Sequence, residues 1–202
     1  MPSQPPAQLG QSFFLRPTLE VAESLLGKLL IRRLNDTLLV GKIVETEAYC
    51  GAEDLACHAS RGKTPRTAIM FGPGGYWYIY LIYGIHHCLN IVTEREDYPA
   101  AVLIRAVEPL RGFAPEVKTN GPGKLCKAYQ LMRALNGTCA FTDDSQLWIA
   151  DHGEVIERTR IVRSPRIGVD YAQEYQDKPW RFYILDHPWV SQPSVPSAKR
   201  QH

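Results

Sequence analysis

Apolar and polar residues alternate with a period of two over several stretches of this chain, and this pattern predicts β-strands. Residues 28–49 carry the alternation on both sides of the turn pair Asn35 and Asp36, so we expect a β-hairpin there. Aromatic and β-branched residues predict a second hairpin over 76–93, with its tip at Gly84. Further strands are predicted over three apolar stretches, 101–106, 147–150 and 180–185.

Two other stretches have the period of an amphipathic helix. The first begins with Thr18 as its N-cap and ends at Gly27, and the second begins at 120–124 and ends at Gly137. Apolar residues line one face of each: Leu19, Ala22, Leu25 and Leu26 in the first, and Leu125, Ala128, Met132 and Leu135 in the second. Helices combined with antiparallel strands predict an α+β fold, with a sheet or roll as its core.

The chain has 202 residues, of which 45% are hydrophobic, and this fits one compact domain. We place that domain at 11–190. The segments 1–10 and 191–202 are rich in proline and polar residues, so we expect a disordered N-terminal tail and a flexible C-terminal tail. The formal net charge is only +2, and any binding of nucleic acid must therefore come from a local basic surface.

Five cysteines without a C-x-x-C pair argue against a disulfide framework and against a zinc ribbon. No stretch approaches the ~18 apolar residues of a membrane span, and the N-terminus lacks the regions of a signal peptide. We therefore expect an intracellular monomer, located in the cytoplasm and nucleoid or, in a eukaryote, in the nucleus.

Glu45 and Glu47 lie on the same side of the strand predicted in the first hairpin, because they are two residues apart. They could be a general base and its partner, or the solvated side of an edge strand. His58 lies in a long, partly basic loop over 50–70, and loops of this length are often functional. A histidine that only makes a local hydrogen bond in such a loop is the alternative.

Four residues are of types that can bind a metal: Glu45, Glu47, Asp54 and His58. Their spacing does not match a known zinc motif, and we predict no metal. The stretch 120–124 resembles a phosphate-binding loop but lacks its spacer, so a helix start is the simpler interpretation. Lys124 and the free N–H groups of such a helix start could still hold a DNA phosphate.

The aromatic residues of the second hairpin have two possible uses. Trp77 and Tyr78 are expected in the core, since aromatic side chains fill the interiors of small β-rolls. Tyr83 stands beside Gly84 at the predicted tip, where its ring would be exposed unless it inserts into a partner. A wedge in a nucleic-acid duplex is one such use.

Taken together, these motifs resemble the alkyladenine (3-methyladenine) DNA glycosylase family over most of the chain, roughly residues 13–190. The resemblance rests on ordered matches that include Val-Glu-Thr-Glu-Ala-Tyr at 44–49, Thr-Pro-Arg at 64–66, the hairpin residues 78–90, Arg-Ala at 105–106, Gly-Pro-Gly-Lys-Leu-Cys at 121–126, Pro-Arg-Ile-Gly-Val at 165–169 and Lys-Pro-Trp-Arg-Phe-Tyr at 178–183.

The resemblance implies a role for individual residues. Glu47 would be the general base, which leaves Glu45 a structural role. Arg105 and the backbone carbonyl of Ile167 would help Glu47 to hold the attacking water. The remaining roles concern the base and the duplex: Tyr49, His58 and Tyr80 would stack on the flipped base, Asn90 would form the pocket floor and help to reject guanine, and Tyr83 would fill the gap in the DNA.

The resemblance also implies the reaction and the partners. A monofunctional glycosylase would flip an alkylated or deaminated purine out of duplex DNA and hydrolyse its N-glycosidic bond with water, leaving an abasic site. It would need no cofactor and no metal. The second hairpin would enter the minor groove. Independently of the resemblance, the basic segments of the chain predict contacts to the DNA backbone from Lys63, Arg66, Lys124 and Arg163.

Two departures from the family pattern are Ile85-His86-His87 after the hairpin tip and Tyr171, where related chains carry His. Either could change the grip on DNA or the range of lesions. Two other functions stay open from the residues alone. One is a DNA-damage binding module without catalysis, and the other is a metallohydrolase that uses Glu45, Glu47 and His58.

Overall fold

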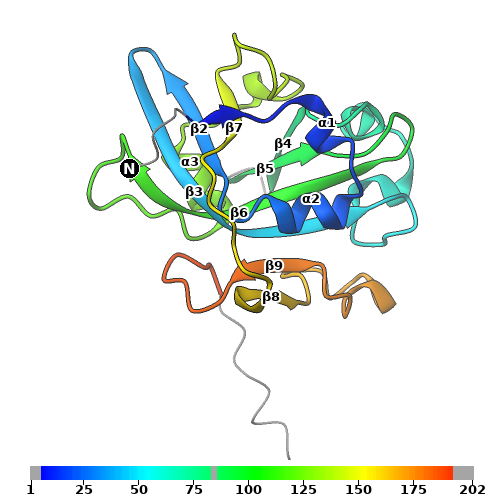
Figure 1. The fold of residues 1–202 in the computed structure, drawn as a ribbon. Coiled ribbons are helices and arrows are strands. Elements are labelled where there is room, and N and C mark those ends of the chain that lie inside the picture. The colour runs from blue at the N-terminus through cyan, green and yellow to red at the C-terminus, as the bar shows by residue number, and fades with distance from the viewer. Residues whose placement is uncertain (1–5, 83–85, 193–202) are drawn as a thin grey trace, which may run out of the picture.

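The computed structural model describes residues 6–82 and 86–192, and over these residues nine strands form one antiparallel sheet (Figure 1). Seven strands follow one path in the order β1-β7-β2-β3-β6-β5-β4, while β9 pairs with β3 and β8 pairs with β9. The strands are β1 (Ala7–Gln8), β2 (Leu29–Leu34), β3 (Thr37–Cys50), β4 (Trp77–Ile82), β5 (His86–Val92), β6 (Ala100–Arg111), β7 (Leu147–Asp151), β8 (Ile161–Ser164) and β9 (Arg181–Ile184).

The helices are short and lie around the sheet (Figure 1). The α-helices are α1 (Gln11–Phe14), α2 (Thr18–Ser24) and α3 (Pro122–Ala128). The 3₁₀ helices are η1 (His58–Arg61), η2 (Ala68–Phe71), η3 (Arg133–Leu135), η4 (Arg158–Arg160) and η5 (Gln173–Tyr175). Buried apolar side chains from α1, α2, α3 and the sheet form one core, which includes Phe14, Val21, Leu25, Trp77 and Leu125. The α+β fold expected from the sequence is confirmed.

Both predicted hairpins are present: β2 pairs with β3, and β4 pairs with β5. Strand β3 is the longest strand and lies inside the sheet. One of its edges pairs with β6, while the other pairs first with β2 and then, at Glu45–Glu47, with β9. The interpretation of the two glutamates as the solvated side of an edge strand is therefore wrong, because β9 covers the edge that β2 leaves free. Both glutamates are 0% exposed.

The second predicted helix is shorter than its apolar pattern suggested. Helix α3 ends at Ala128, and Gln130 takes a left-handed conformation with φ of 51°, so the chain turns there. Met132 is consequently 62% exposed instead of facing the core. In the first helix Pro17 is the N-cap, and the Thr18 hydroxyl donates a hydrogen bond of 2.7 Å to Glu94 instead.

The ordered region extends beyond the predicted domain limits at both ends. Residues 7 and 8 form β1 and pair with β7, inside the stretch expected as an N-terminal tail. At the other end Ser191 binds Glu45 through its backbone and side chain, and the carbonyl of Gln192 accepts a hydrogen bond from Arg181. These contacts order the start of the stretch expected as a flexible tail.

Strand β8 lies within the basic segment 158–166, which the sequence did not identify as a strand. All five cysteines are free thiols. No helix in the described part of the chain is both long and apolar enough to cross a membrane.

Candidate active site

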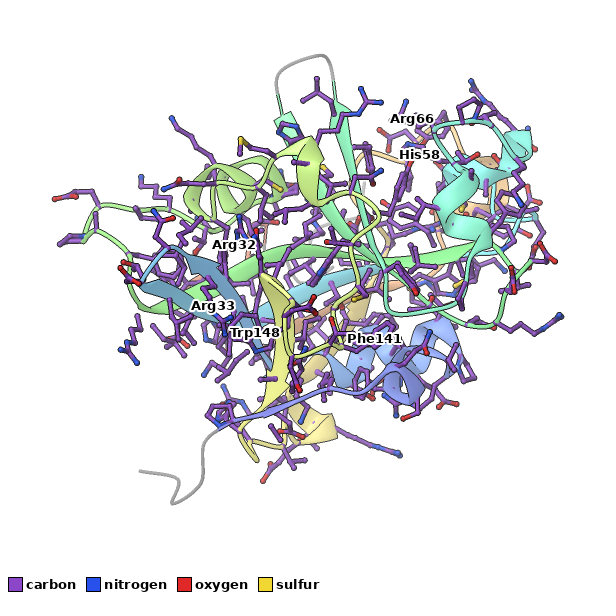
Figure 2. All side chains as sticks on the ribbon, turned by 90° about the horizontal axis from the view of Figure 1, so that it is seen from above. Arg32, Arg33, His58, Arg66, Phe141 and Trp148 are labelled. Carbon is purple, nitrogen blue, oxygen red and sulfur yellow. The ribbon has the colours of Figure 1, made fainter. Side chains whose placement is uncertain are left out.

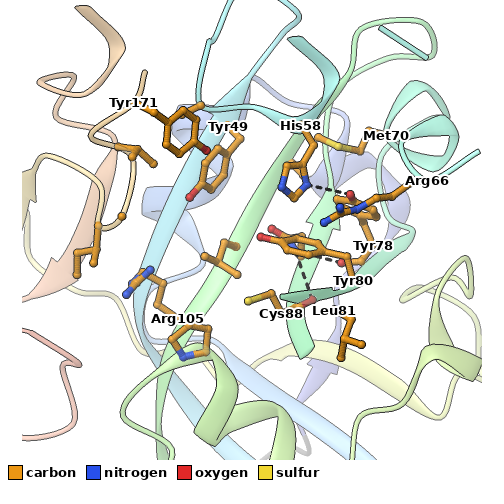
Figure 3. A pocket seen from close by; sticks show the side chains of 18 residues that line it. Tyr49, His58, Arg66, Met70, Tyr78, Tyr80, Leu81, Cys88, Arg105 and Tyr171 are labelled. Carbon is orange, nitrogen blue, oxygen red and sulfur yellow. Dashed lines mark hydrogen bonds between the residues drawn. The ribbon is translucent and has the colours of Figure 1, made fainter. Parts of the chain in front are cut away.

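A cavity of about 340 Å³ lies between the end of β3, the β4–β5 hairpin, the loop around η1 and the segment 167–171 (Figure 3). Seven of the residues to which the sequence assigned a role line it: Tyr49, His58, Arg66, Tyr80, Asn90, Arg105 and Ile167. They come from five separate parts of the chain. The fold therefore brings together side chains whose proximity could not be read from their spacing.

Glu47 lies behind this lining and is held by three donors. Its Oε1 accepts a hydrogen bond of 2.8 Å from the Ile167 backbone N–H. Its Oε2 accepts bonds from the Tyr49 hydroxyl at 2.9 Å and from Arg105 Nη1 at 3.3 Å. Each carboxylate oxygen offers about two acceptor sites, and among the described residues only Ile167 donates to Oε1, which leaves one site for another donor. It is the amide of Ile167 that contacts Glu47, and the predicted role of its carbonyl stays a prediction.

Glu45 is bound differently, although it faces the same side of the strand. Its Oε1 accepts bonds from Arg181 Nε at 2.7 Å and from Arg105 Nε at 3.3 Å. The Ser191 backbone N–H donates to its Oε2 at 2.7 Å, and the Ser191 hydroxyl donates to Oε1 at 3.0 Å. Glu45 is absent from the described lining of the cavity and ties the C-terminal segment to the sheet.

Arg105 bridges the two glutamates because of a local irregularity in strand β6. Glu45 is paired with Ala106 and the next residue, Thr46, with Ile104, so Arg105 is the extra residue of a β-bulge. Burial lowers the pKa of Arg105, but the neighbouring Glu47 and Glu45 outweigh this and raise it above its ordinary value. The guanidinium therefore stays charged at the bottom of the cavity.

Aromatic side chains face each other across the cavity, with Tyr49 on one side and His58 and Tyr80 on the other (Figure 3). The His58 and Tyr80 rings meet edge to face, with centroids 4.5 Å apart. Burial, helped by Arg66 and Arg61, lowers the pKa of His58 to about 4, so the imidazole is neutral at physiological pH. Burial and the adjacent Glu47 raise the pKa of Tyr49, which keeps its phenol protonated as a donor.

Tyr78 and Asn90 complete the wall formed by the second hairpin. Tyr78 is buried, as expected, but it also lines the cavity, and its hydroxyl lies 3.0 Å from His58 Nδ1. Asn90 Nδ2 donates to the Tyr78 carbonyl at 3.1 Å, which fixes the amide at the cavity wall. Trp77, on the opposite face of β4, is a core residue as predicted.

The sequence did not identify several lining residues, including Met70, Tyr78, Cys88 and Tyr171. For Tyr78 a signal existed, because it alternates with Tyr80 on one face of the same strand. Tyr171 was noted only as a departure from the family pattern. It is 65% exposed and lies at the mouth of the cavity next to Tyr49 (Figure 3).

The residues predicted to contact the DNA backbone do not all lie near the cavity. Arg66 lines its mouth, with its guanidinium 5.1 Å from the Tyr80 ring centre, and lies beside His58 in Figure 2. Lys63 is exposed in the same loop, and Lys124 is exposed two residues after Pro122, which lines the cavity. The predicted wedge, Tyr83, falls outside the described residues.

Arg163 lies on the other face of the sheet. It is paired with Phe182, which is in turn paired with Thr46, and residues paired in this way point to the same side. The Thr46 hydroxyl donates to the Ala22 carbonyl of α2, and Arg163 binds Glu23 of the same helix at 2.5 Å. Arg166, in the same basic segment, is buried and paired with Asp54, so it does not face a phosphate.

The residues of the metallohydrolase alternative are not arranged as metal ligands. The carboxylates of Glu45 and Glu47 both accept hydrogen bonds from Arg105. His58 Nδ1 is hydrogen-bonded to the Tyr78 hydroxyl. Among the side chains that the structure describes, no group of three or more His, Cys, Asp or Glu could hold a metal ion. The geometry therefore does not support that alternative.

Comparison with known proteins identifies the family of this chain. Residues 12–188 match the model of the family described as methylpurine-DNA glycosylase (MPG). A relative from Myxococcus xanthus is 48% identical over 192 residues, covering 95% of this chain and 97% of the relative. Another, from Methanocella arvoryzae, is 50% identical over 196 residues, covering 91% and 95%. Both are named for 3-methyladenine DNA glycosylase. The resemblance inferred from the motifs is confirmed, and the chain belongs to the methylpurine-DNA glycosylase family of DNA repair enzymes.

Proposed function

We propose that this DNA glycosylase excises alkylated or deaminated purines, among them 3-methyladenine, 7-methylguanine, ethenoadenine and hypoxanthine, and leaves an abasic site. The observation that carries the proposal is the Glu47 carboxylate, which is buried behind an aromatic cavity and retains an acceptor site on Oε1. Burial of a charged carboxylate costs free energy, and its retention at this position therefore indicates a function.

The cavity can hold a purine that has left the duplex. Tyr49 stands on one side of it and His58 and Tyr80 on the other, which suits a flat ring placed between them (Figure 3). Stacking of this kind contributes roughly 1–3 kcal/mol per base. It offsets part of the few kcal/mol needed to extrude the nucleotide, a cost that is smallest for bases that pair poorly.

Hydrolysis requires a water molecule between Glu47 and the sugar. Glu47 accepts the proton of this water through the free site on Oε1, and the new C–O bond forms as the N-glycosidic bond breaks and the base leaves with the bonding electrons. The sugar carries positive charge in the transition state, and the nearby carboxylate stabilises it. The N–H of Ile167 and the hydroxyl of Tyr49 keep Glu47 oriented throughout.

Binding of the duplex uses the surface around the cavity mouth. Arg66, Lys63 and Lys124 are exposed there and are placed to contact phosphates, while Tyr83 fills the gap left by the flipped nucleotide. Asn90 lies at the cavity wall, where an exocyclic amine on a normal guanine would meet a fixed amide. Normal guanine is thereby disfavoured.

The test is incubation of the protein with duplexes that each carry one of the four lesions, followed by measurement of strand breaks with and without alkali. We expect breaks only after alkali, because a monofunctional glycosylase leaves an intact abasic site. The free base should be released while the abasic sugar stays in the strand. Strand cleavage without alkali would contradict direct hydrolysis.

A variant of the general base separates this activity from that of a contaminating enzyme. Glu47→Gln prepared in the same way should lack excision while retaining affinity for the lesion duplex. This outcome also distinguishes the enzyme from a DNA-damage binding module without catalysis, for which wild type and variant would both bind and neither would excise.

A further inference from the structure

We propose that Asp54 and Arg166, which lie behind the Tyr49 wall, are positioning residues that hold this wall and keep it electrically neutral, so that the cavity accepts cationic bases. The inference rests on the proposed function, because it concerns the lesions that the enzyme selects. Neither residue belongs to the described lining of the cavity.

Asp54 and Arg166 form a buried, two-pronged ion pair. Arg166 Nη1 lies 2.5 Å from Asp54 Oδ2, and Arg166 Nη2 lies 2.8 Å from Asp54 Oδ1. Both side chains are 0% exposed. Asp54 also accepts the backbone N–H groups of Cys50 at 3.1 Å and Ala56 at 3.0 Å, so the pair ties the end of β3 to the loop that carries His58.

Arg166 connects this pair to the cavity wall and to Glu47. Its guanidinium carbon lies 4.8 Å from the centre of the Tyr49 ring and 5.0 Å from that of Trp180, and Nη1 donates to the Ala48 carbonyl at 2.9 Å. The next residue, Ile167, donates its N–H to Glu47. A displacement of Arg166 would therefore move the Tyr49 ring and one of the three donors to Glu47.

The charge of the pair matters because Arg166 approaches Tyr49 from outside the cavity. An aromatic face attracts a cation through its negative π-cloud, and a positive charge on the opposite face opposes that attraction. Charges are poorly screened when both partners are buried. Asp54 cancels the charge of Arg166, so a base that enters the cavity meets a tyrosine ring with its ordinary affinity for cations.

The buried charged groups around the wall are balanced, while Arg66 at the cavity mouth adds a positive charge 5.1 Å from the centre of the Tyr80 ring. Three buried acids, Glu45, Glu47 and Asp54, are matched by three buried arginines, Arg105, Arg166 and Arg181. His58 adds no charge above about pH 4. Loss of the Asp54 charge would leave the buried Arg166 charge uncompensated behind Tyr49. This further positive charge would act against N-alkylated purines, which are cationic as nucleosides, but not against neutral hypoxanthine.

The experiment compares single-turnover excision of 7-methylguanine and hypoxanthine from duplexes of identical sequence by the full-length protein. In Asp54→Asn we expect the ratio of the 7-methylguanine rate to the hypoxanthine rate to fall about fivefold, corresponding to about 1 kcal/mol of cation–π attraction. Arg166→Met removes the positive charge as well as the contacts. It should slow excision of both bases without lowering the ratio.

Glu23→Gln is the matched control and should leave both rates unchanged. Like Asp54, Glu23 is paired with an arginine, but its partner Arg163 is exposed and lies away from the cavity. A partial loss of folding lowers both rates together and cannot imitate a change of ratio. An unchanged ratio in Asp54→Asn, or an equal fall in Asp54→Asn and Arg166→Met, would overturn the inference. If wild type excised neither base, the proposed function itself would be wrong.

Discussion

Over residues 44–48 both faces of strand β3 are buried, but they are chemically opposite. On one face Val44 and Ala48 join the apolar core, and the Thr46 hydroxyl binds helix α2. On the other face Glu45 and Glu47 are surrounded by arginines. Apolar burial stabilises the fold by about 25 cal/mol for each Å² removed from water, whereas buried ion pairs often contribute little net stability. The charged face is thus better explained by function than by stability.

The largest effect should come from Glu47→Gln, which keeps the size of the side chain but removes the base. A positioned general base contributes 10²–10⁴-fold to a rate, so we expect single-turnover excision to fall about a thousandfold. Glu45→Gln is the matched comparison and should retain excision within about tenfold while the protein is folded. The roles of the two acids would have to be exchanged if Glu45→Gln were the inactive variant.

Next in size is the effect of Glu45→Gln on stability. Glu45 binds Arg181, Arg105 and Ser191, and removal of one charge from a buried ion network costs about 3–5 kcal/mol. Urea denaturation should show a corresponding loss in the free energy of unfolding. A loss below about 1 kcal/mol would mean that the C-terminal segment is held by other contacts.

A smaller effect, which arises across the cavity from β3, concerns the pH dependence of stability. The pKa of His58 is lowered to about 4 in the folded protein, while that of the unfolded chain is about 6.5. The unfolded state therefore binds the proton first, and His58 makes the protein less stable as pH falls from about 6.5 to about 4. His58→Gln should reduce the drop in melting temperature between pH 7 and pH 5. An identical drop in both proteins would contradict the assigned shift.

The smallest effect is expected on the α2 face. Arg163 is paired with Glu23, but its side chain is 60% exposed, and such pairs contribute about 0–1 kcal/mol. Arg163→Ala should change the melting temperature little and leave DNA affinity unchanged at low and high salt. A weaker dependence of affinity on salt in this variant would instead support the phosphate contact that the sequence suggested.

How far the sequence predicts the site differs from residue to residue. The resemblance to the family placed Tyr49, His58, Tyr80, Asn90 and Arg105 at one pocket, and all five line the cavity. It named the carbonyl of Ile167 and not the amide, which contacts Glu47, since this contact depends on the path of the chain after β8. It also missed the Asp54–Arg166 pair, whose members are 112 residues apart in the sequence.

The sequence by itself determined the two hairpins and the side of β3 on which Glu45 and Glu47 lie. These features depend on alternation between residues close in the chain. Tertiary structure alone decided that the two acids are buried, because β9 covers that edge of β3 from more than 130 residues away. It also decided where α3 ends and which arginines stay in solvent. Contacts between distant segments determine burial, and burial decides whether a charge is a surface group or part of the site.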